Sequence, residues 1–480
     1  MLADTKPNNY IECISGFPAF IELTTHLMKT QNPFFTTSRR EFMKAGSAAV
    51  VGSVVASSFP MSANAFYSSD DVIKIGIIGC GGRGTGATVQ ALSTKQNIKL
   101  VAMADAFSDR LEESYEQITN PDAEHAGAVA GRFDVPAERR FVGFDAYKQL
   151  IPLVDVVLIA TPPGFRPIHF EAAVAADKHV FMEKPVATDS PGIRSVLATA
   201  EIAKQKKLNV VVGLQRHYQN EYREWVDRMH NGMIGDITTG RVYWNSGGVW
   251  VRDRAGLEAK AGRTLTEMEY QMRNWYYFNW LCGDHIVEQH IHNIDVGNWV
   301  KNAYPVRAQG QGGRLVRTGA DHGEIFDHHY VEYEYADGSR MISQCRHMPN
   351  TMSRVTEAFH GTKGSAPRPG VLLSASGETL YQHDGRNDIN PYQVEHDELF
   401  AAVAAGEYKY ADAENGANAT MSAILGRMCT YSGQLIEWDD ALNSPLSLMP
   451  TTFAWDAAPP VLPNEQGMYK IAVPGETKVL

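Results

Sequence analysis

The stretch that decides the fold is Val72-Ile73-Lys74-Ile75-Gly76-Ile77-Ile78, which runs directly into Gly79-Cys80-Gly81-Gly82-Arg83-Gly84. The first part is a continuous apolar run, typical of a strand buried on both faces. The second part fits the pattern G-x-G-x-x-G and is followed by a helical stretch over residues 85–93. In such a loop Gly79 permits a tight turn, Gly81 lets the backbone approach a pyrophosphate, and Gly84 lets helix and strand pack closely.

A second apolar stretch, residues 98–104, ends at Asp105. Asp105 lies 21 residues after Gly84, and a carboxylate about 20 residues beyond the third glycine is typical of one that binds the adenosine ribose of a dinucleotide. Because an acid at this position repels a 2′-phosphate, we expect NAD as the cofactor. NADP is the alternative, since Arg110 lies nearby.

Strands and helices continue to alternate after Asp105. We expect strands over 154–160, 179–182 and 209–212, and helices over 169–176 and 191–206. This alternation predicts an α/β fold with a doubly wound parallel sheet. Residues 66–215 are therefore assigned to an NAD(P)-binding Rossmann domain.

The composition is that of a globular protein with an acidic excess. The chain has 480 residues, 44 Lys and Arg against 55 Asp and Glu, and a formal charge of −11. This balance argues against a nucleic-acid or anionic-membrane partner, because both need clustered positive charge. The five cysteines form no C-x-x-C pair, so neither a disulfide scaffold nor a zinc finger is expected.

The first 65 residues have the pattern of a twin-arginine export signal. Arg39-Arg40 precede an uncharged stretch over 45–60 and the small-x-small site Ala63-Asn64-Ala65. The apolar stretch is too short for a stable membrane anchor. We therefore expect the twin-arginine translocation machinery as a partner and a periplasmic protein. Because that route carries folded proteins, we also expect a tightly bound cofactor.

Several motifs of the Rossmann half resemble the glucose-fructose oxidoreductase, inositol dehydrogenase and rhizopine-catabolism (Gfo/Idh/MocA) family. They are the glycine loop, Ala160-Thr161-Pro162-Pro163 with His169, Glu183-Lys184-Pro185 and Gly213-Leu214-Gln215-Arg216-His217-Tyr218. The resemblance implies an oxidoreductase that acts on CH–OH groups, with Lys184 reaching the reacting carbinol. The cofactor-binding set it implies, together with the glycine loop, is Gly79, Gly81, Gly82, Arg83, Gly84, Asp105, Thr161, Pro162, His169, Glu183 and Lys184.

Aromatic residues gather after Tyr218. Six of the eight tryptophans fall between Trp225 and Trp299, and the densest group is the stretch 275–280. Flat apolar rings stack on the C–H faces of sugars, so this density suits a carbohydrate or polyol substrate, and core packing is the alternative for any single ring. We expect Trp275 in the substrate site.

The stretch that follows is expected to form one helix, capped by Asp284. A single helix would place His285, Glu288, His292, Asp295 and Trp299 on one face. Relatives in the family carry Asp-x-x-x-His-x-x-Asp on the matching helix, which here aligns as Glu288-x-x-x-His292-x-x-Asp295. Glu in place of the first Asp leaves the exact substrate open.

The family pattern and general acid–base chemistry suggest three catalytic residues. A neutral His292 with a pKa near the working pH would accept the hydroxyl proton, Lys184 would stabilise the alkoxide, and Glu288 would orient or relay. Substrate contacts are expected from Gln215, Arg216, His217, Tyr218, Trp275, His285 and Asp295. Two alternatives for the helix remain: purely structural histidines, and a divalent metal on His285, Glu288 and His292. We predict no metal.

Residues 216–480 are assigned to an α+β domain for substrate binding and oligomerisation. Expected strands at 237–244 and 306–310 and a hairpin over 330–346 indicate a mixed, largely antiparallel sheet. Two long helices over 393–405 and 413–434 should fold back on the body. The family resemblance further implies a homo-oligomer.

The leading hypothesis is an exported NAD(P)-dependent oxidoreductase that acts on a sugar, polyol or sugar derivative and regenerates its bound cofactor in place. The first alternative is an NAD-dependent glycosidase that transiently oxidises the sugar and gives no net redox change. The second is a non-catalytic, cofactor-bound sensor or binding protein.

Overall fold

The glycine-loop stretch forms β1 (Ile73–Ile78) and α2 (Gly82–Leu92) in a computed structural model that describes residues 71–480. The predicted export signal, residues 1–65, lies outside the described residues. No helix of the described part is both long and apolar enough to cross a membrane. The cysteines described there, which are Cys80, Cys282, Cys345 and Cys429, are buried free thiols.

The first sheet has six parallel strands in the order β3-β2-β1-β4-β5-β6. Its other strands are β2 (Ile98–Asp105), β3 (Arg140–Val142), β4 (Val156–Ile159), β5 (His179–Met182) and β6 (Val210–Val212). The strand order reverses between β1 and β4, which is where ligands bind in open α/β sheets. The predicted doubly wound parallel sheet is confirmed.

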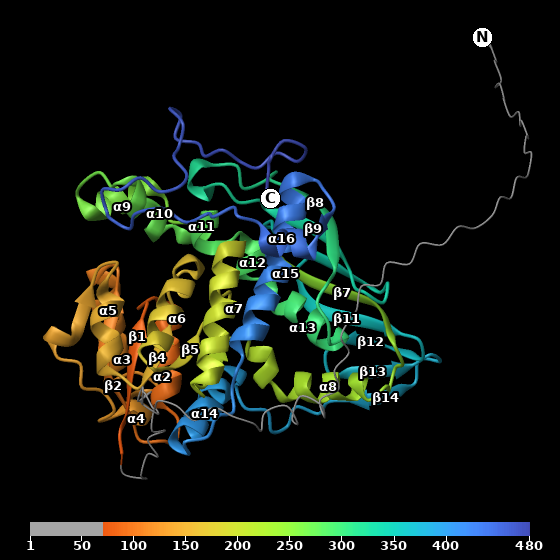
Figure 1. The fold of residues 1–480 in the computed structure, drawn as a ribbon, viewed down its shortest axis with the longest axis horizontal. Helices are drawn as coiled ribbons and strands as arrows, with labels where there is room; N and C mark the ends of the chain where they lie inside the picture. The colour runs from red at the N-terminus through yellow and green to blue at the C-terminus, as the bar shows by residue number, and fades with distance from the viewer. Residues whose placement is uncertain (1–70) are drawn as a thin grey trace, which may run out of the picture. The chain divides into compact units, whose positions relative to one another are not determined.

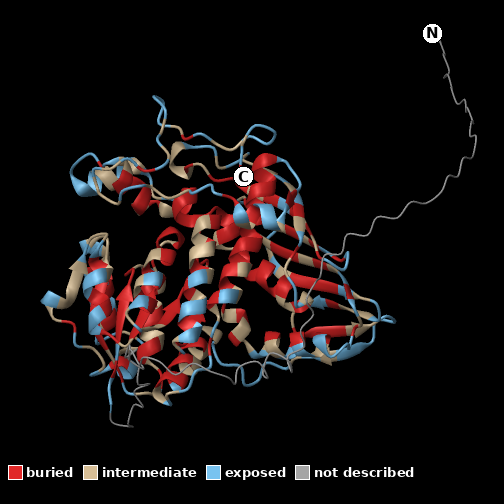
Figure 2. Ribbon diagram, viewed as in Figure 1, coloured by how far each residue is buried: buried red, intermediate tan, exposed pale blue. Residues whose placement is uncertain are grey.

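Helices cover both faces of this sheet (Figure 1). One face carries α2, α3 (Ser108–Thr119) and α14 (Pro391–Ala404). The other carries α5 (Ala146–Leu150), α6 (Arg166–Ala175) and α7 (Ser190–Gln205). Because both faces are covered, the strands are buried almost throughout, as Figure 2 shows.

The second sheet has nine strands in the order β14-β13-β12-β11-β7-β10-β9-β8-β15. Only β7 and β10 pair in parallel, which confirms a mixed, largely antiparallel sheet. The strands are β7 (Ile237–Ser246), β8 (Arg307–Gly313), β9 (His328–Glu334), β10 (Arg340–His347), β11 (Arg354–Gly361), β12 (Gly364–Arg368), β13 (Val371–Ser374), β14 (Thr379–Gln382) and β15 (Ile436–Glu437). The predicted hairpin is β9–β10, and its turn contains Gly338 with φ +79°.

Two helices pack on one face of the second sheet: α13 (Ile291–Lys301) contacts β7 and β11, and α15 (Ala413–Ser432) contacts β8 and β9. The chain also folds back on the Rossmann half, because α15 packs on α7 and α14 on α2. The remaining helices are α4 (Ala126–Val129), α8 (Asn220–His230), α9 (Arg254–Ala261), α10 (Glu267–Arg273), α11 (Asn279–Cys282), α12 (His285–Glu288) and α16 (Trp438–Asn443). C-terminal residues thus help to build the first domain's core.

The prediction of one continuous helix from Asp284 to Trp299 is wrong. The structure has a short α12, a break at Gln289 and His290, and then α13. The carbonyl oxygen of Glu288, which a continuous helix would offer to the N–H of His292, instead accepts a hydrogen bond from Lys184 Nζ at 2.6 Å. The His292 N–H turns to Gln289 O at 3.4 Å. The break therefore coincides with the contact between Lys184 and the Glu288 carbonyl.

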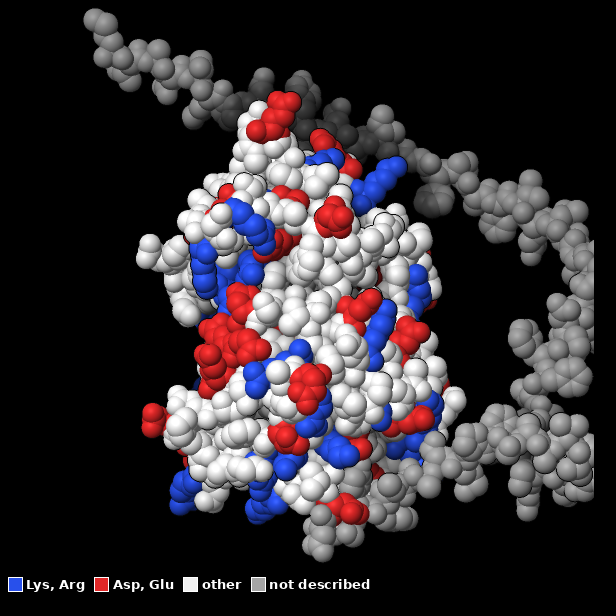
Figure 3. Space-filling model, turned by 90° about the vertical axis from the view of Figure 1, so that its left-hand side faces the viewer, with Lys and Arg blue, Asp and Glu red and all other residues white. Residues whose placement is uncertain are grey.

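Acidic and basic side chains are interspersed on the face drawn in Figure 3, without a continuous basic field. This distribution agrees with the acidic composition and offers no electrostatic footprint for a nucleic acid on that face.

Candidate functional site

A cavity of about 550 Å³ lies at the carboxyl ends of the parallel strands. Its walls include Asp105 at the end of β2 and residues that follow β1, β4 and β5, among them Gly79, Thr161 and Lys184. Side chains from the second domain, such as His292, complete it. This is the position and size expected for a small-molecule or cofactor site in such a fold.

The glycine loop has the geometry that its three glycines predict. Gly79 has φ +96°, a conformation that side chains rarely adopt. A Cβ on Gly84 would lie 1.9 Å from Gly79 O, so helix and strand pack there without room for a methyl group. Beside Gly81 and Gly82 a Cβ would meet nothing within 4 Å, and both residues line the cavity. The backbone N–H groups at the start of α2 therefore face open space suited to a pyrophosphate.

Asp105 lies at the end of β2 and lines the same cavity. Its two carboxylate oxygens accept hydrogen bonds from Cys80 N at 2.6 Å and Phe107 N at 2.8 Å. Burial raises the pKa of Asp105, and these two backbone donors oppose that rise. The carboxylate is thereby fixed in place beside the glycine loop, where a ribose hydroxyl would meet it.

Arg83, within the glycine loop, is held by two acids from distant parts of the chain. It forms ion pairs with Glu183 and with Glu395, the latter at 3.1 Å, and its guanidinium lies 4.9 Å from the ring centre of Tyr392. Burial raises the pKa of Glu395 well above its usual range, as does the neighbouring Glu183. Arg83 is therefore a charged wall of the cavity whose position depends on α14.

Thr161, Pro162 and His169 line the cavity beyond β4. Thr161 Oγ1 and His169 Nδ1 are hydrogen bonded at 3.2 Å. Burial lowers the pKa of His169 to about 3, so its imidazole is neutral. All of the predicted cofactor residues line this cavity except Gly84, which allows α2 to pack closely on the backbone of Gly79.

Lys184, Glu288 and His292 meet in the same cavity. Lys184 Nζ donates to the Glu288 carbonyl at 2.6 Å and to Glu288 Oε1 at 3.1 Å. His292 packs against Trp244, with ring centres 5.9 Å apart, and its buried Nδ1 has no hydrogen-bond partner. Burial and the charge of Lys184 lower the pKa of His292 well below its usual value. The imidazole is neutral, as predicted, but its pKa does not lie near the working pH.

The predicted substrate residues divide between the cavity and other places. Trp275 lines the cavity. Arg216 is buried in an ion pair with Glu357, and Tyr218 donates to Asp412 at 2.5 Å. None of Gln215, Arg216, His217, Tyr218, His285 and Asp295 lines it.

His217 and Asp295 instead pair with each other at 2.8 Å, and the buried Oε1 of Gln215 has no partner. This placement gives no support to their predicted contact with substrate.

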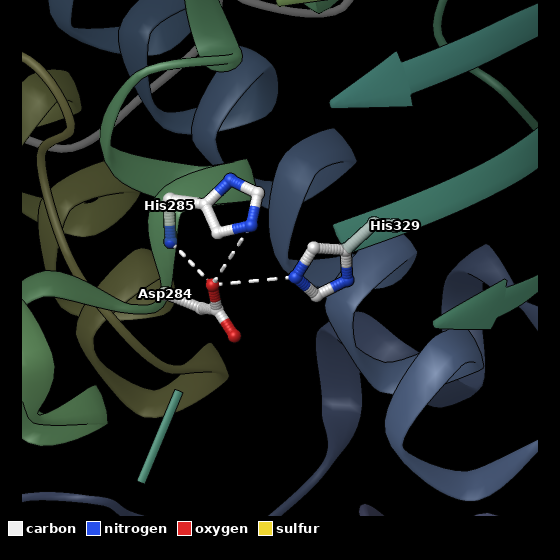
Figure 4. A group of neighbouring side chains, drawn as sticks. All are labelled: Asp284, His285 and His329. Atoms are coloured by element: carbon white, nitrogen blue, oxygen red, sulfur yellow. Dashed lines mark hydrogen bonds and ion pairs between the residues drawn. The ribbon is translucent and has the colours of Figure 1, made fainter. Parts of the chain in front are cut away.

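His285 lies in a buried cluster with Asp284 and His329 (Figure 4). The break after α12 rotates it away from the face that carries His292. The alternative metal set of His285, Glu288 and His292 is therefore not brought together among residues 71–480.

Other residues that line the cavity could not be predicted, because they lie at no regular distance from the glycine loop in the sequence. The additional aromatic and basic residues of the cavity wall include Phe107, Phe144, Tyr147, Phe165, Arg166, Trp244, Trp250, Arg252, Arg273 and Tyr392. Trp280, by contrast, is fully buried in the core. The aromatic density was thus a partial signal, since Trp244, Trp250 and Trp275 reach the cavity and Trp225 and Trp280 do not.

Comparison with known proteins agrees with the geometry of the Rossmann half. Residues 73–214 match the Gfo/Idh/MocA family, described as an oxidoreductase family with an NAD-binding Rossmann fold. An inositol 2-dehydrogenase of Pseudomonas savastanoi pv. phaseolicola is 32% identical over 168 residues, which are 34% of this chain and 43% of that protein. A glycosyl hydrolase family 109 protein of Streptomyces coelicolor is 23% identical over 180 residues, 36% of this chain and 34% of that one.

These curated relatives are matched over less than half of their own length. A solved structure extends the likeness of fold: scyllo-inositol dehydrogenase from Lactobacillus casei, with bound NAD(H) and scyllo-inositol, has a TM-score of 0.55 at 20% identity and covers 77% of this chain and 100% of that one. Residues 73–214 therefore match the NAD-binding Rossmann domain of the Gfo/Idh/MocA oxidoreductase family.

Proposed function

We propose that this chain is an exported, NAD-dependent oxidoreductase that acts on a CH–OH group of a sugar, polyol or sugar derivative. The observation that carries the proposal is one cavity that joins a dinucleotide-type glycine loop to Lys184, Glu288 and His292. Relatives that share the Rossmann domain include inositol 2-dehydrogenases.

The residues present fit a nicotinamide dinucleotide. Gly81 and Gly82 leave open space at the start of α2, and a hydrogen bond from Cys80 N fixes the carboxylate of Asp105 beside them. Thr161 and Pro162 line the same cavity as Lys184. When bound, the dinucleotide would take up or return the hydride of the substrate carbon. Its 2′-hydroxyl form is favoured, because an ionised Asp105 disfavours a 2′-phosphate.

The remaining chemistry belongs to the side chains. As the C–H bond is oxidised, the hydroxyl proton must leave, and the neutral imidazole of His292 is the acceptor that the cavity offers. Lys184 places a positive charge in the same cavity, which stabilises negative charge developing on the substrate oxygen. Glu288 receives two hydrogen bonds from Lys184 and so orients its ammonium group.

Export by the twin-arginine route and a periplasmic location are part of the proposal. They rest on Arg39-Arg40, the uncharged stretch over 45–60 and Ala63-Asn64-Ala65. Because nicotinamide nucleotides are expected to be scarce outside the cytoplasm, the cofactor should be tightly bound and regenerated in place. A homo-oligomer is also proposed, since strands such as β9 alternate buried and more exposed residues, leaving one sheet face open to a partner copy.

A second candidate is a glycosidase that oxidises the sugar transiently and ends with no net redox change. The specific observation in its favour is the match to glycosyl hydrolase family 109 proteins over the Rossmann half. The same side chains would serve both reactions.

Product analysis separates the two candidates. The purified chain would be incubated with a panel of polyols, aldoses and aryl glycosides, and the products would be identified by mass spectrometry. Ketose or lactone formation, or reduction of the bound nucleotide, supports the oxidoreductase. Release of free sugar from an aryl glycoside without net oxidation supports the glycosidase. If neither reaction occurs and Lys184→Ala and His292→Ala leave the biological effect intact, both enzyme proposals fail.

A further inference from the structure

Asp284, His285 and His329 form a buried cluster outside the cavity, which we call the Asp284 cluster (Figure 4). Asp284 directly precedes α12, His285 is the first residue of α12, and His329 lies on β9. Asp284 and His285 are 0% exposed and His329 is 3% exposed. Two segments that are far apart in sequence therefore bring three potential metal ligands together at one buried site.

The histidines of the Asp284 cluster have unused lone pairs. Neither ring nitrogen of His285 has a hydrogen-bond partner, although buried imidazoles nearly always have one. His329 Nδ1 is held by Thr430 Oγ1 at 2.9 Å, and its Nε2, which makes no hydrogen bond among the described residues, lies 3.2 Å from Asp284 Oδ1. Buried imidazole nitrogens without hydrogen-bond partners are available to a metal ion.

The spacing of the three ligand atoms suits a small tetrahedral ion. Asp284 Oδ1 lies 3.2 Å from His329 Nε2 and 3.9 Å from His285 Nε2, and all three ligand atoms lie within 4.8 Å of one another. Bonds of about 2.0–2.1 Å at tetrahedral angles place neighbouring ligand atoms roughly 3.3 Å apart. A small movement of His285 would complete this arrangement.

Asp284 supplies a carboxylate oxygen that faces both imidazoles. Its Oδ2 accepts hydrogen bonds from the hydroxyl of Tyr431 and the N–H of Phe326. Within residues 71–480 the ion pairs of its Oδ1 are to His285 and His329 alone.

We propose that Asp284, His285 and His329 bind one divalent transition-metal ion, with zinc as the ion that best suits two imidazoles and a carboxylate. The ring of His347 stacks on His285 with centres 4.2 Å apart, and its buried Nδ1 has no hydrogen-bond partner among the described residues. Tyr431 and Phe326 N hold the second oxygen of Asp284, and Thr430 holds His329, as partners beyond the ligands do in metal sites.

The proposed ion would act on structure rather than on substrate, because no residue of the Asp284 cluster lines the cavity. It would fix the start of α12, and the end of α12 is Glu288, which holds Lys184. His347 adds a second connection, since its Nε2 lies 2.8 Å from Oε1 of Gln289, a wall residue of the cavity. The three ligands are therefore positioning residues for Lys184.

Metal analysis of the full chain tests the proposal. The protein would be purified without chelators from cells grown with zinc, manganese and iron, and its metals measured by inductively coupled plasma mass spectrometry. We expect about one zinc ion per chain in the parent and less than about a tenth of that in His329→Gln and His285→Gln.

His396→Gln is the matched control, because His396 is equally buried and also has two unpartnered ring nitrogens but belongs to no group of potential metal ligands among residues 71–480. It should retain the metal.

A second measurement covers variants that fail to fold. Denaturing the parent in the presence of a zinc indicator should release about one ion per chain, and removal of that ion should lower the midpoint of thermal unfolding until zinc is restored. A parent chain that contains no stoichiometric metal and gains no stability from added zinc, manganese or iron would overturn the proposal. So would full metal retention by folded His329→Gln.

Discussion

Gly84→Ala is the change whose consequence follows most directly from the structure. The added methyl carbon would lie 1.9 Å from the carbonyl oxygen of Gly79 and 3.3 Å from Cβ of Ala160. The nearest atom belongs to the backbone of the glycine loop, so no flexible side chain can move aside. The first turn of α2 must shift away from β1 or distort the loop.

The expected magnitude combines two opposing effects. Overpacking a tight contact costs about 1–3 kcal/mol. Replacing a helical glycine by alanine contributes about 0.5–1 kcal/mol in the other direction. Because the clash is with rigid backbone, we expect a net loss of about 1–2 kcal/mol in the free energy of unfolding, together with weaker nucleotide binding.

Two other glycines of α2 provide matched controls. At Gly86 the nearest atom to a new Cβ is Arg83 Nη1 at 3.5 Å, an ordinary contact, so Gly86→Ala should keep or slightly raise stability. Gly82→Ala meets no protein atom within 4 Å but lines the cavity. It should keep the stability of the nucleotide-free chain and still weaken nucleotide binding.

The assay is urea unfolding followed by tryptophan fluorescence on nucleotide-free protein, combined with a nucleotide titration of each variant. The reasoning would be refuted if Gly84→Ala were as stable as Gly86→Ala, or if Gly82→Ala bound NAD as tightly as the parent.

Three further changes have expected outcomes. Lys184→Met should lower kcat at least ~10²-fold with little change in circular dichroism, because it removes the positive charge beside the substrate oxygen, and full activity would contradict that role. Glu357→Gln leaves the buried Arg216 without its anion and should cost about 3–5 kcal/mol of unfolding free energy. Glu334→Gln, in a more exposed pair, should lower the midpoint of thermal unfolding far less, and equal midpoints for the two variants would refute the difference. Burial lowers the pKa of His179 to about 4, and its Nδ1 accepts from Asn209 N at 2.9 Å. The stability that a neutral His179 contributes above pH 6.5 should therefore be lost as the pH falls toward 4. The midpoint of thermal unfolding should drop more over this range in the parent than in His179→Gln, and equal drops would contradict the prediction.

The Rossmann half could be predicted from sequence because its signals are local. The apolar run before Gly79, the three glycines and Asp105 all lie within one βαβ unit, and the structure places them as that unit requires. The hydrophobic periodicity and the spacing of the glycines are sufficient to predict this unit, because its strand, turn and helix are adjacent in the chain.

The helix after Asp284 shows where local reasoning ends. Its periodicity is compatible with one amphipathic helix, but Lys184, about a hundred positions earlier, takes the carbonyl of Glu288. At this break the two helical segments separate, and His292 lines the cavity whereas His285 does not. A contact of this kind leaves no periodic trace in the sequence.

The same limit applies to residues near Gly213. Arg216 and Tyr218 follow the first sheet directly, yet their partners Glu357 and Asp412 come from the distant second half of the chain. Wall residues such as Trp244 and Tyr392 were missed for the same reason. The fold was therefore more predictable than the site, since the site is assembled from segments that only tertiary packing brings together.

The most direct test of the central claim is mass spectrometry of small molecules released from the purified, denatured full chain. The account predicts a nicotinamide dinucleotide, NAD rather than NADP, at close to one molecule per chain, and its loss or marked depletion in Gly82→Ala. A chain that carries no nicotinamide nucleotide after purification and binds none on titration with NAD or NADP would contradict the account.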